Sequence, residues 1–318
     1  MTIQEIYELG LDMALDSDPR GRKEVERLLK KAKKSYDELS DKKKKLFDTE
    51  DLKNPYTDSR ILVGDPKQQV KKILTGIDLN ASEVLLADRL NEKGMGIDLL
   101  IAHHPEGAAL ARLYDVMDVQ VDMYERAGVP VGMAQGLFED RKGIVKRRFS
   151  PLNLFQAIDS AKLLGLSYMT MHTFWDNLGN KFVTDYLAQK DLETAGDVLE
   201  AINEIPEFAM AIKMKNPPMI VSGSENRRVG KMAVSYTGGT NGSKEAYVEL
   251  AKSGISTLVE MHVAEDALVE LRKMNVNVID CGHMAADSIG ANLFFDALEK
   301  KGVEVVPCSG IMRVKRGK

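Results

Sequence analysis

From Arg60 onward, short apolar runs alternate with amphipathic helical stretches, and this alternation restricts the fold more than any other feature of the sequence. Apolar runs bounded by turn residues predict strands, and apolar residues recurring every three or four positions predict helices. The predicted strands span 60–64, 97–104, 129–135, 166–172, 231–239, 255–262 and 276–283, and the predicted helices span 66–74, 109–127, 151–165 and 243–253. Strands that alternate with helices indicate an α/β fold of mainly parallel sheets flanked by helices.

The sequence pattern divides the chain into three parts. Helical spacing of apolar residues before Asn54-Pro55 predicts a helical extension at the N-terminus. The predicted divisions are the extension at 1–55, a first α/β lobe at 56–190 and a second α/β segment at 191–318. No internal repeat and no low-complexity tract is visible in the sequence.

Charge and cysteine content argue against several classes of protein. The 318 residues carry a formal net charge of −4, which does not suggest a nucleic-acid binder. No apolar run approaches the length of a membrane span, and the N-terminus lacks the basic end and apolar core of a signal peptide. Only Cys281 and Cys308 are present, so a reducing, cytoplasmic location is expected. The lysine clusters at 30–34 and 42–45 favour a solvated helix face over a docking arm for anions, because acidic residues are interspersed.

The histidines share one kind of position in the predicted fold. His103, His104, His172, His262 and His283 all lie at or just past the C-terminal end of a predicted strand. In open α/β sheets the ligand site lies in the crevice outside these strand ends. Neutral imidazole is also the commonest metal ligand among side chains. The shared position therefore favours a ligand site over five unrelated structural or surface histidines.

Carboxylates accompany two of these histidines at helical spacing. Asp176 follows His172 by four positions, and Asp287 follows His283 by four positions. Residues four apart lie on one face of a helix. Imidazole and carboxylate ligands suit zinc, iron, manganese or nickel better than they suit a thiolate cluster. The sequence thus predicts a metal site at the strand ends.

Other polar residues near the strand ends are weaker candidates. Glu106, Glu260 and His262 could act as general acid or base beside a metal, although each alone is more often a supporting or surface residue. The segment Thr237–Ser243, TGGTNGS, could bind an anion through backbone amides, but an ordinary tight turn is expected at least as often because the full phosphate-loop pattern is missing. Cys281 is interpreted as a buried thiol, since no second cysteine lies at ligand spacing.

Three motifs resemble those of the NGG-one-interacting-factor-three-like metalloprotein family, also catalogued as GTP cyclohydrolase type-two homologues. The family pattern is a strand ending in HHP, a later HT-x-x-D and a near-terminal GH-x-x-x-E. The corresponding segments here are His103–Pro105, His172–Asp176 and Gly282–Asp287. Order and context match from about Arg60 to Cys308, which is most of the chain.

The resemblance implies a dinuclear centre with two divalent metal ions. The protein ligands implied by position are His103, His104, Asp176, His283 and Asp287. The resemblance also implies two interlinked α/β lobes and often a ring-shaped homohexamer whose metal sites face an internal cavity.

The chain departs from the family pattern in three ways. Asp287 stands where the family usually has Glu, so its carboxylate has a shorter reach between two ions. The separation of His104 and His172 is long for the family and indicates an inserted segment around 116–148. The helical extension at the N-terminus also looks additional. The insertion and the extension could change the entrance to the site or the assembly.

The first functional interpretation is a metal-dependent hydrolase acting on a small heterocyclic or nucleotide-like substrate, with Glu260 or His262 as the candidate for proton transfer. A rival from another class is a metal carrier or interaction protein without turnover. A third is a structural metal site that only ties the lobes together. Closed coordination would favour the structural site, and open positions would favour catalysis.

Overall fold

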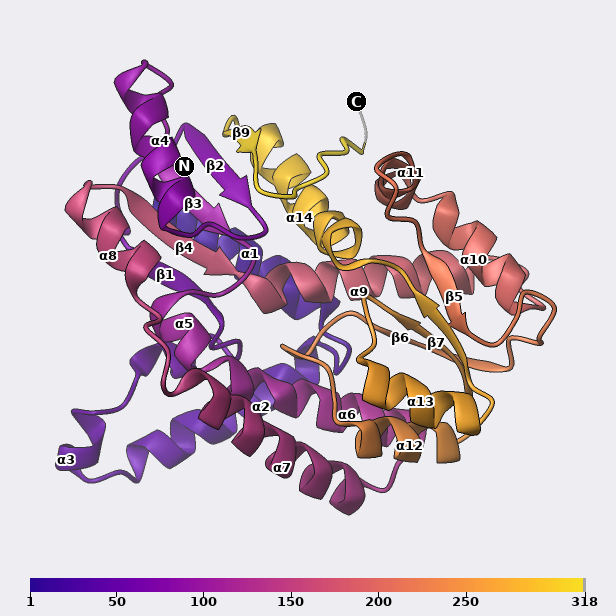
Figure 1. Cartoon of the computed structure of the whole chain (residues 1–318). Helices are drawn as coiled ribbons and strands as arrows, with labels where there is room; N and C mark the ends of the chain where they lie inside the picture. Colours follow the sequence, from indigo (N-terminus) through magenta and orange to yellow (C-terminus); the bar gives the residue numbers. More distant parts are fainter. Residues whose placement is uncertain (317–318) are drawn as a thin grey trace.

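A computed structural model, which describes residues 1–316, contains two sheets built to the same plan (Figure 1). The first sheet has the order β1 (Ser59–Val63), β4 (Ser167–Met171), β3 (Leu99–Ala102), β2 (Lys72–Gly76) and β9 (Glu304–Pro307). The second has the order β5 (Met219–Ser222), β8 (Asn277–Asp280), β7 (Ile255–Glu260) and β6 (Lys231–Ser235). In each sheet the first strand is an antiparallel edge strand with an irregular register, and all other neighbours are parallel.

Helices cover the sheets and connect their strands. The first lobe carries α4 (Ala81–Glu92), α5 (Gly107–Ala111), the 3-10 turn η2 (Leu113–Met117), α6 (Asp118–Ala127), α7 (Val131–Phe149), α8 (Gln156–Leu163) and α9 (His172–Ala188). The second carries α10 (Ala195–Asn203), α11 (Pro206–Lys213), α12 (Lys244–Lys252), α13 (Glu265–Lys273) and α14 (His283–Lys300). The α/β class predicted from the sequence is confirmed.

The N-terminal extension is helical, as the sequence predicts. It comprises α1 (Ile3–Ser17), α2 (Arg22–Asp37), α3 (Asp41–Lys44) and the 3-10 turn η1 (Thr49–Leu52). Thr2 and Glu5 form a capping box at the start of α1. The buried face of α1, with Ile3, Ile6 and Tyr7, packs in the same apolar cluster as Phe174 of α9. Helix α1 of the extension is therefore part of the core beneath the first sheet, whereas α2 buries only Val25 and α3 buries no residue.

The long helices α9 and α14 cross at the centre of the molecule (Figure 1). A Cβ atom on Gly290 would lie 1.9 Å from the backbone oxygen of Trp175, so the two backbones touch at this point. Gly179 faces the same crossing. Because α9 follows β4 and α14 follows β8, the crossing turns the C-terminal ends of the two sheets toward each other.

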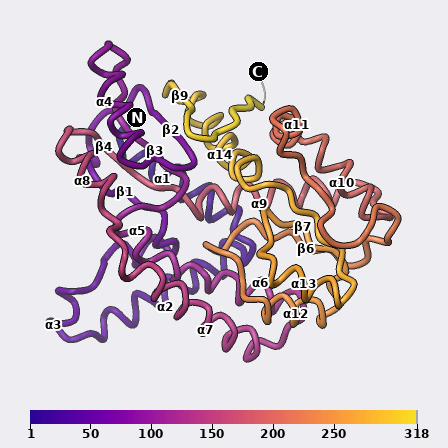
Figure 2. The backbone as a smooth tube through the Cα atoms, in the orientation of Figure 1, coloured from indigo at the N-terminus to yellow at the C-terminus, as the bar shows by residue number. Residues whose placement is uncertain are grey.

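The lobes are interlinked at two further places. The last strand, β9, returns to the first sheet and pairs in parallel with β2, and Figure 2 shows this yellow segment beside the purple one. In addition, α6 and α7 leave the first lobe and pack against the second. Tyr124 and Phe138 share an apolar cluster with Tyr247, Leu250 and Leu258.

Several local predictions were wrong. Residues 129–135 begin α7 instead of a strand, because Pro130 occupies the N-cap and Ala134, Phe138 and Val145 are buried at helical spacing. The predicted helix at 66–74 contains the start of β2.

The remaining local differences concern helix limits and two unpredicted strands. The predicted helix at 109–127 is broken into α5, η2 and α6, and α8 begins at Gln156 because Ser150 still caps α7. Strands β5 and β9 were not predicted. Among the described helices, none combines the length and apolar character needed to cross a membrane.

Candidate metal centre

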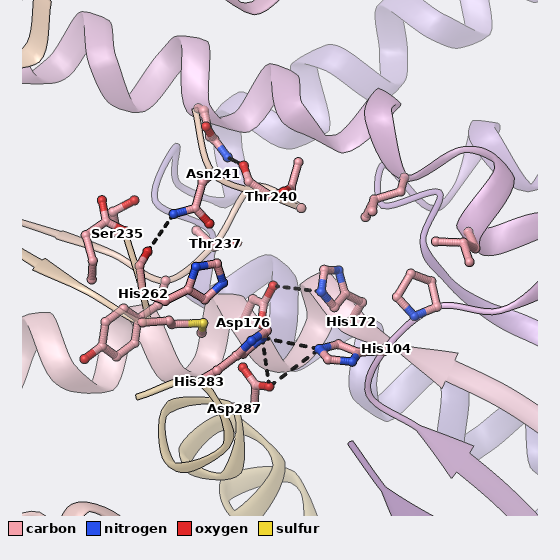
Figure 3. A pocket seen from close by; sticks show the side chains of 18 of the residues that line it. His104, His172, Asp176, Ser235, Thr237, Thr240, Asn241, His262, His283 and Asp287 are labelled. Atoms are coloured by element: carbon pink, nitrogen blue, oxygen red, sulfur yellow. Dashed lines mark hydrogen bonds and ion pairs between the residues drawn. The ribbon is translucent and has the colours of Figure 1, made fainter. Parts of the chain in front are cut away.

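The facing ends of the two sheets enclose a cavity of about 320 Å³ (Figure 3). Its walls come from the residues that follow β2, β3, β6 and β7 and from the first turns of α9 and α14. The five histidines of the sequence lie in or beside it: His104, His172, His262 and His283 line it, and the His103 ring is next to those of His104 and His172. The strand-end placement predicted for the histidines therefore brings them together, except that His172 and His283 are already the first residues of helices.

His103 stands at the buried end of the centre. Its side chain is fully buried, and its Nε2 lies 3.3 Å from Asp176 Oδ1 and 3.4 Å from Asp287 Oδ1. The ring is stacked on the Trp175 indole with 5.6 Å between centroids. Burial alone would disfavour a charged imidazole, but the two carboxylates outweigh it and raise the pKa of His103 to about 10.

A second group of ligand atoms lies on the cavity side. His104 Nε2 and His283 Nε2 are 3.3 Å apart, and Asp287 Oδ2 lies 3.7 Å and 3.3 Å from them respectively. Asp287 thus contributes one oxygen to each group. Burial opposes ionisation of Asp287, but the surrounding histidines outweigh that effect and lower its pKa. For His283, burial lowers the pKa.

The two groups have the chemistry of metal-ligand sets. Ligand atoms of His103, Asp176 and Asp287 converge, as do those of His104, His283 and Asp287. Both ring nitrogens of His103, both oxygens of Asp287 and Oδ1 of Asp176 are buried without a hydrogen-bond partner among the described residues. Buried polar atoms are rarely left unpartnered in a folded chain, and divalent cations would satisfy the carboxylate oxygens and one ring nitrogen of His103. These residues therefore fit a metal centre.

Two carboxylates orient histidines at the centre, and sequence reasoning missed both. Asp58 Oδ2 lies 2.8 Å from His172 Nδ1 and accepts a 2.7 Å hydrogen bond from Thr173 Oγ1. Asp78 Oδ1 lies 2.7 Å from His104 Nδ1. Each contact leaves the Nε2 atom of its histidine facing the centre, and such outer carboxylates are typical partners of metal-bound histidine. Asp78 comes shortly after β2, so the strand-end rule would have found it had β2 been predicted.

His172 belongs to the centre as well, although the family resemblance did not include it among the ligands. A ring nitrogen of His172 lies within reach of those of His103 and His104. Burial disfavours its charged form, but Asp176 and Asp58 outweigh that effect and raise its pKa. The HT-x-x-D motif contained the signal, because His172 and Asp176 share a helix face.

The remaining candidates lie on both sides of the cavity: Glu106 follows β3 of the first sheet, and Glu260 and His262 lie at the end of β7 in the second. The His262 ring lies 4.8 Å from the His283 ring, and Glu260 is buried at the end of β7. Burial raises the pKa of Glu260 to about 8, and burial together with Asp78 raises that of Glu106 to about 7. The Thr237–Ser243 loop also lines the cavity. Cys281 is fully buried.

A short repeat links α9 and α14. The pattern H-x-x-x-D-x-x-G occurs as His172 to Gly179 and again as His283 to Gly290. In each copy the histidine and aspartate reach the centre and the glycine lies at the helix crossing. The repeat is visible in the printed sequence, yet it is short enough to be overlooked without the fold.

Comparisons with known proteins agree with this architecture. Residues 151–311 match the model of the Duf34/NIF3 (NGG1p interacting factor 3) family. The chain is similar to a solved NIF3 superfamily protein from Sphaerobacter thermophilus, with 25% identity, 98% of each chain covered and a TM-score of 0.75. No curated protein matches the chain.

More remote similarities are found to two other solved structures. Reduced HcgD from Methanocaldococcus jannaschii matches with 15% identity and a TM-score of 0.48 over 78% of this chain and 87% of that one. TTHA1606 from Thermus thermophilus matches with 15% identity and a TM-score of 0.48 over 84% of this chain and 93% of that one.

Proposed function

The chain belongs to the Duf34/NIF3 family, and on that premise we propose that it is a metal-dependent hydrolase of a small heterocyclic or nucleotide-like substrate. One observation carries the proposal. Asp287 joins two groups of buried, unpartnered ligand atoms, and the second group borders a cavity large enough for a small molecule. A purely structural ion would need neither the cavity nor the second group.

We propose His103, His104, Asp176, His283 and Asp287 as ligands of two divalent ions, drawn from zinc, iron, manganese or nickel. When bound, the ions would supply Lewis-acid polarisation of the substrate. The chain itself orients the ligands, since Asp78 fixes His104 and Asp58 fixes the neighbouring His172. His262, whose ring lies 4.8 Å from that of His283, and Glu260 line the same cavity, and we propose them as the proton-transfer residues.

The test combines metal analysis with a substrate screen. Protein purified without chelator should contain about two divalent ions per chain, and Asp176→Ala should contain fewer. Parent and Asp176→Ala, each loaded with several metals, are then assayed against phosphoesters, cyclic amides and purines. Turnover confined to the parent is the expected result, with Lys43→Ala as the matched control. Metal binding without turnover across the panel would favour the alternative of a carrier or interaction protein.

We further propose that the protein forms a homo-oligomer, with a hexamer favoured by the family resemblance, and that it acts in the cytoplasm. The two free thiols, Cys281 and Cys308, suit a reducing compartment. Light scattering at micromolar concentration tests the assembly. A mass near the 35.3 kDa of one chain would contradict it.

A further inference from the structure

We propose that the wall facing the metal centre is a recognition site for an uncharged cyclic amide or related nitrogen heterocycle, held in shape by α6 and α7. The wall consists of Glu260, His262 and the Thr237–Ser243 loop. The inference rests on the proposed function, because it names the class of substrate that the same cavity would take.

The charge of the cavity argues against a polyanionic substrate. Among the described residues that line it there is no lysine and no arginine. The lining carboxylates are Asp78, Glu106, Asp176, Glu260 and Asp287. Two divalent ions would offset the negative charge of the carboxylates in the centre. The opposite wall, however, has no lysine or arginine that could bind the phosphates of a polyphosphate substrate. A substrate that contacts this wall should therefore be uncharged there.

Glu260 supplies one half of the recognition chemistry. Its Oε1 is buried without a hydrogen-bond partner among the described residues, although Glu260 lines the cavity. Five titratable groups surround Glu260. They are Tyr124 in α6, Tyr236 after β6, Tyr247 in α12, Asp280 at the end of β8 and Cys281 directly after it.

None of these neighbours of Glu260 is cationic. Burial raises the pKa of Glu260 to about 8, so its carboxyl is mostly protonated at neutral pH. A protonated carboxyl presents a hydrogen-bond donor and an acceptor side by side.

Asn241 supplies a further acceptor on the same wall (Figure 3). Its Nδ2 donates to the backbone oxygen of His262 at 2.6 Å and to the Tyr247 hydroxyl at 3.2 Å. Both amide protons are thereby committed, and Oδ1 is left to accept. An amide built into a ring carries adjacent N–H and C=O groups, which match an acceptor and a donor on the wall.

The helices α6 and α7 fix the position of this loop, and Gln120 of α6 also lines the cavity. Gln120 of α6 is buried, and its Nε2 donates to the backbone oxygens of Gly238 and Thr240. Arg141 of α7 donates to the backbone oxygen of Asn241 at 3.0 Å. Gly238 has φ +101°, and a Cβ there would lie 2.4 Å from Gln120 Cγ, so the loop fits closely on Gln120. Gln120 and Arg141 are thus positioning residues for Asn241.

Calorimetry on the metal-loaded protein tests the proposal without requiring turnover. The probes are dihydrouracil, hydantoin and 2-pyrrolidone, all of which are cyclic amides. The parent should bind at least one of them, and Glu260→Ala should weaken that binding roughly tenfold or more. Glu260→Gln should retain it within about threefold, because a carboxamide also offers a donor and an acceptor. Parent affinity should fall above about pH 8, whereas Glu260→Gln affinity should not.

Arg141→Ala tests the positioning role, because Arg141 holds Asn241 without lining the cavity. It should weaken probe binding roughly three- to tenfold while the bound metal content stays at the parent level. Loss of metal together with probe binding would instead mean general damage to the fold and would count against the positioning role. The recognition proposal is overturned if no probe binds the parent, or if Glu260→Ala binds probes as the parent does. Glu260-dependent probe binding without any turnover would contradict only the hydrolase, and phosphoester turnover without probe binding would contradict only the recognition site.

Discussion

The two sheets end in the same way but carry different side chains at their ends. In the first, the last residue of β3 pairs with Thr170, and His103 and His104 come next in the chain. In the second, Glu260 ends β7 opposite Asp280, and Met261 and His262 come next. Counted from the ends of β3 and β7, His104 and His262 are both the second residue after the strand, and Met261 follows β7 where the buried His103 follows β3.

The difference shows how one backbone plan can supply two kinds of chemistry. The first sheet has outer carboxylates, Asp58 and Asp78, that orient its histidines. Asp58 directly precedes β1 and Asp78 is the second residue after β2, and the corresponding residues at β5 and β6 are Pro218 and Thr237, which offer no carboxylate. Strand geometry brings both ends to one cavity, and both ends contribute to the two groups of candidate metal ligands, the second through His283 and Asp287 at the start of α14. The second end also supplies the polar wall of Glu260, His262 and the Thr237–Ser243 loop.

The largest expected effect breaks the contact that holds the two ends together. Gly290→Ala inserts a Cβ where the Trp175 backbone oxygen lies 1.9 Å away, so α14 must move. We expect a loss of about 2–4 kcal/mol in the free energy of unfolding and a marked loss of bound metal. Chemical denaturation and elemental analysis measure both. Gly132→Ala is the control, because it adds a Cβ in α7 with nothing within 4 Å. Equal stability of the two variants would refute the close crossing.

The next prediction compares the metal content of two variants, one at Asp287 and one at Asp176. Asp287 lies in both groups and Asp176 only in the first. Asp287→Asn should therefore lower bound metal from about two ions per chain to well below one, whereas Asp176→Asn should leave about one. Elemental analysis under matched loading decides. Equal losses in the two variants would show that Asp287 does not join the groups.

A smaller effect concerns the other sheet end. Glu260 has a folded-state pKa near 8, above its ordinary value of 4.5, so its contribution to stability is fully present below about pH 4.5 and is lost as the pH rises through 8. Gln does not titrate. Glu260→Gln should gain about 2–4 kcal/mol relative to the parent between pH 4.5 and 9. Denaturation curves at both pH values test this, and a constant difference would mean that Glu260 ionises normally.

The smallest expected effect concerns Asp58, the carboxylate beside His172 that has no counterpart in the second sheet. Asp58→Asn removes the charge that faces His172 Nδ1. Metal affinity should fall by roughly tenfold, measured by competition with a chelator. Lys43→Ala, on the exposed face of α3, should leave the affinity unchanged. Unaltered affinity in Asp58→Asn would mean that the contact between Asp58 and His172 does not support metal binding at this centre.

The sequence predicted the α/β class and the gathering of five histidines in or beside one cavity, because both depend on local apolar runs and on the residues directly after each run. It did not predict β9, whose short Glu304–Pro307 run becomes a strand only beside β2. It also missed Asp58, which is far from His172 in sequence and meets it only through pairing of β1 with β4. The domain limits at 55 and 190 and the ligand set remain predictions.

The return of β9 to the first sheet has a consequence for synthesis on the ribosome. Until residues 304–307 emerge, β2 is an open parallel edge with unpaired backbone groups, so the N-terminal lobe cannot finish folding before almost the whole chain has been made. A nascent chain that has completed only its first lobe would expose the unpaired edge of β2, which could pair with strands of neighbouring polypeptides. Truncation before β9 should therefore damage the first lobe as well as the second, where Met312 packs and Arg316 pairs with Glu207, although the missing residues lie beyond both lobes in sequence.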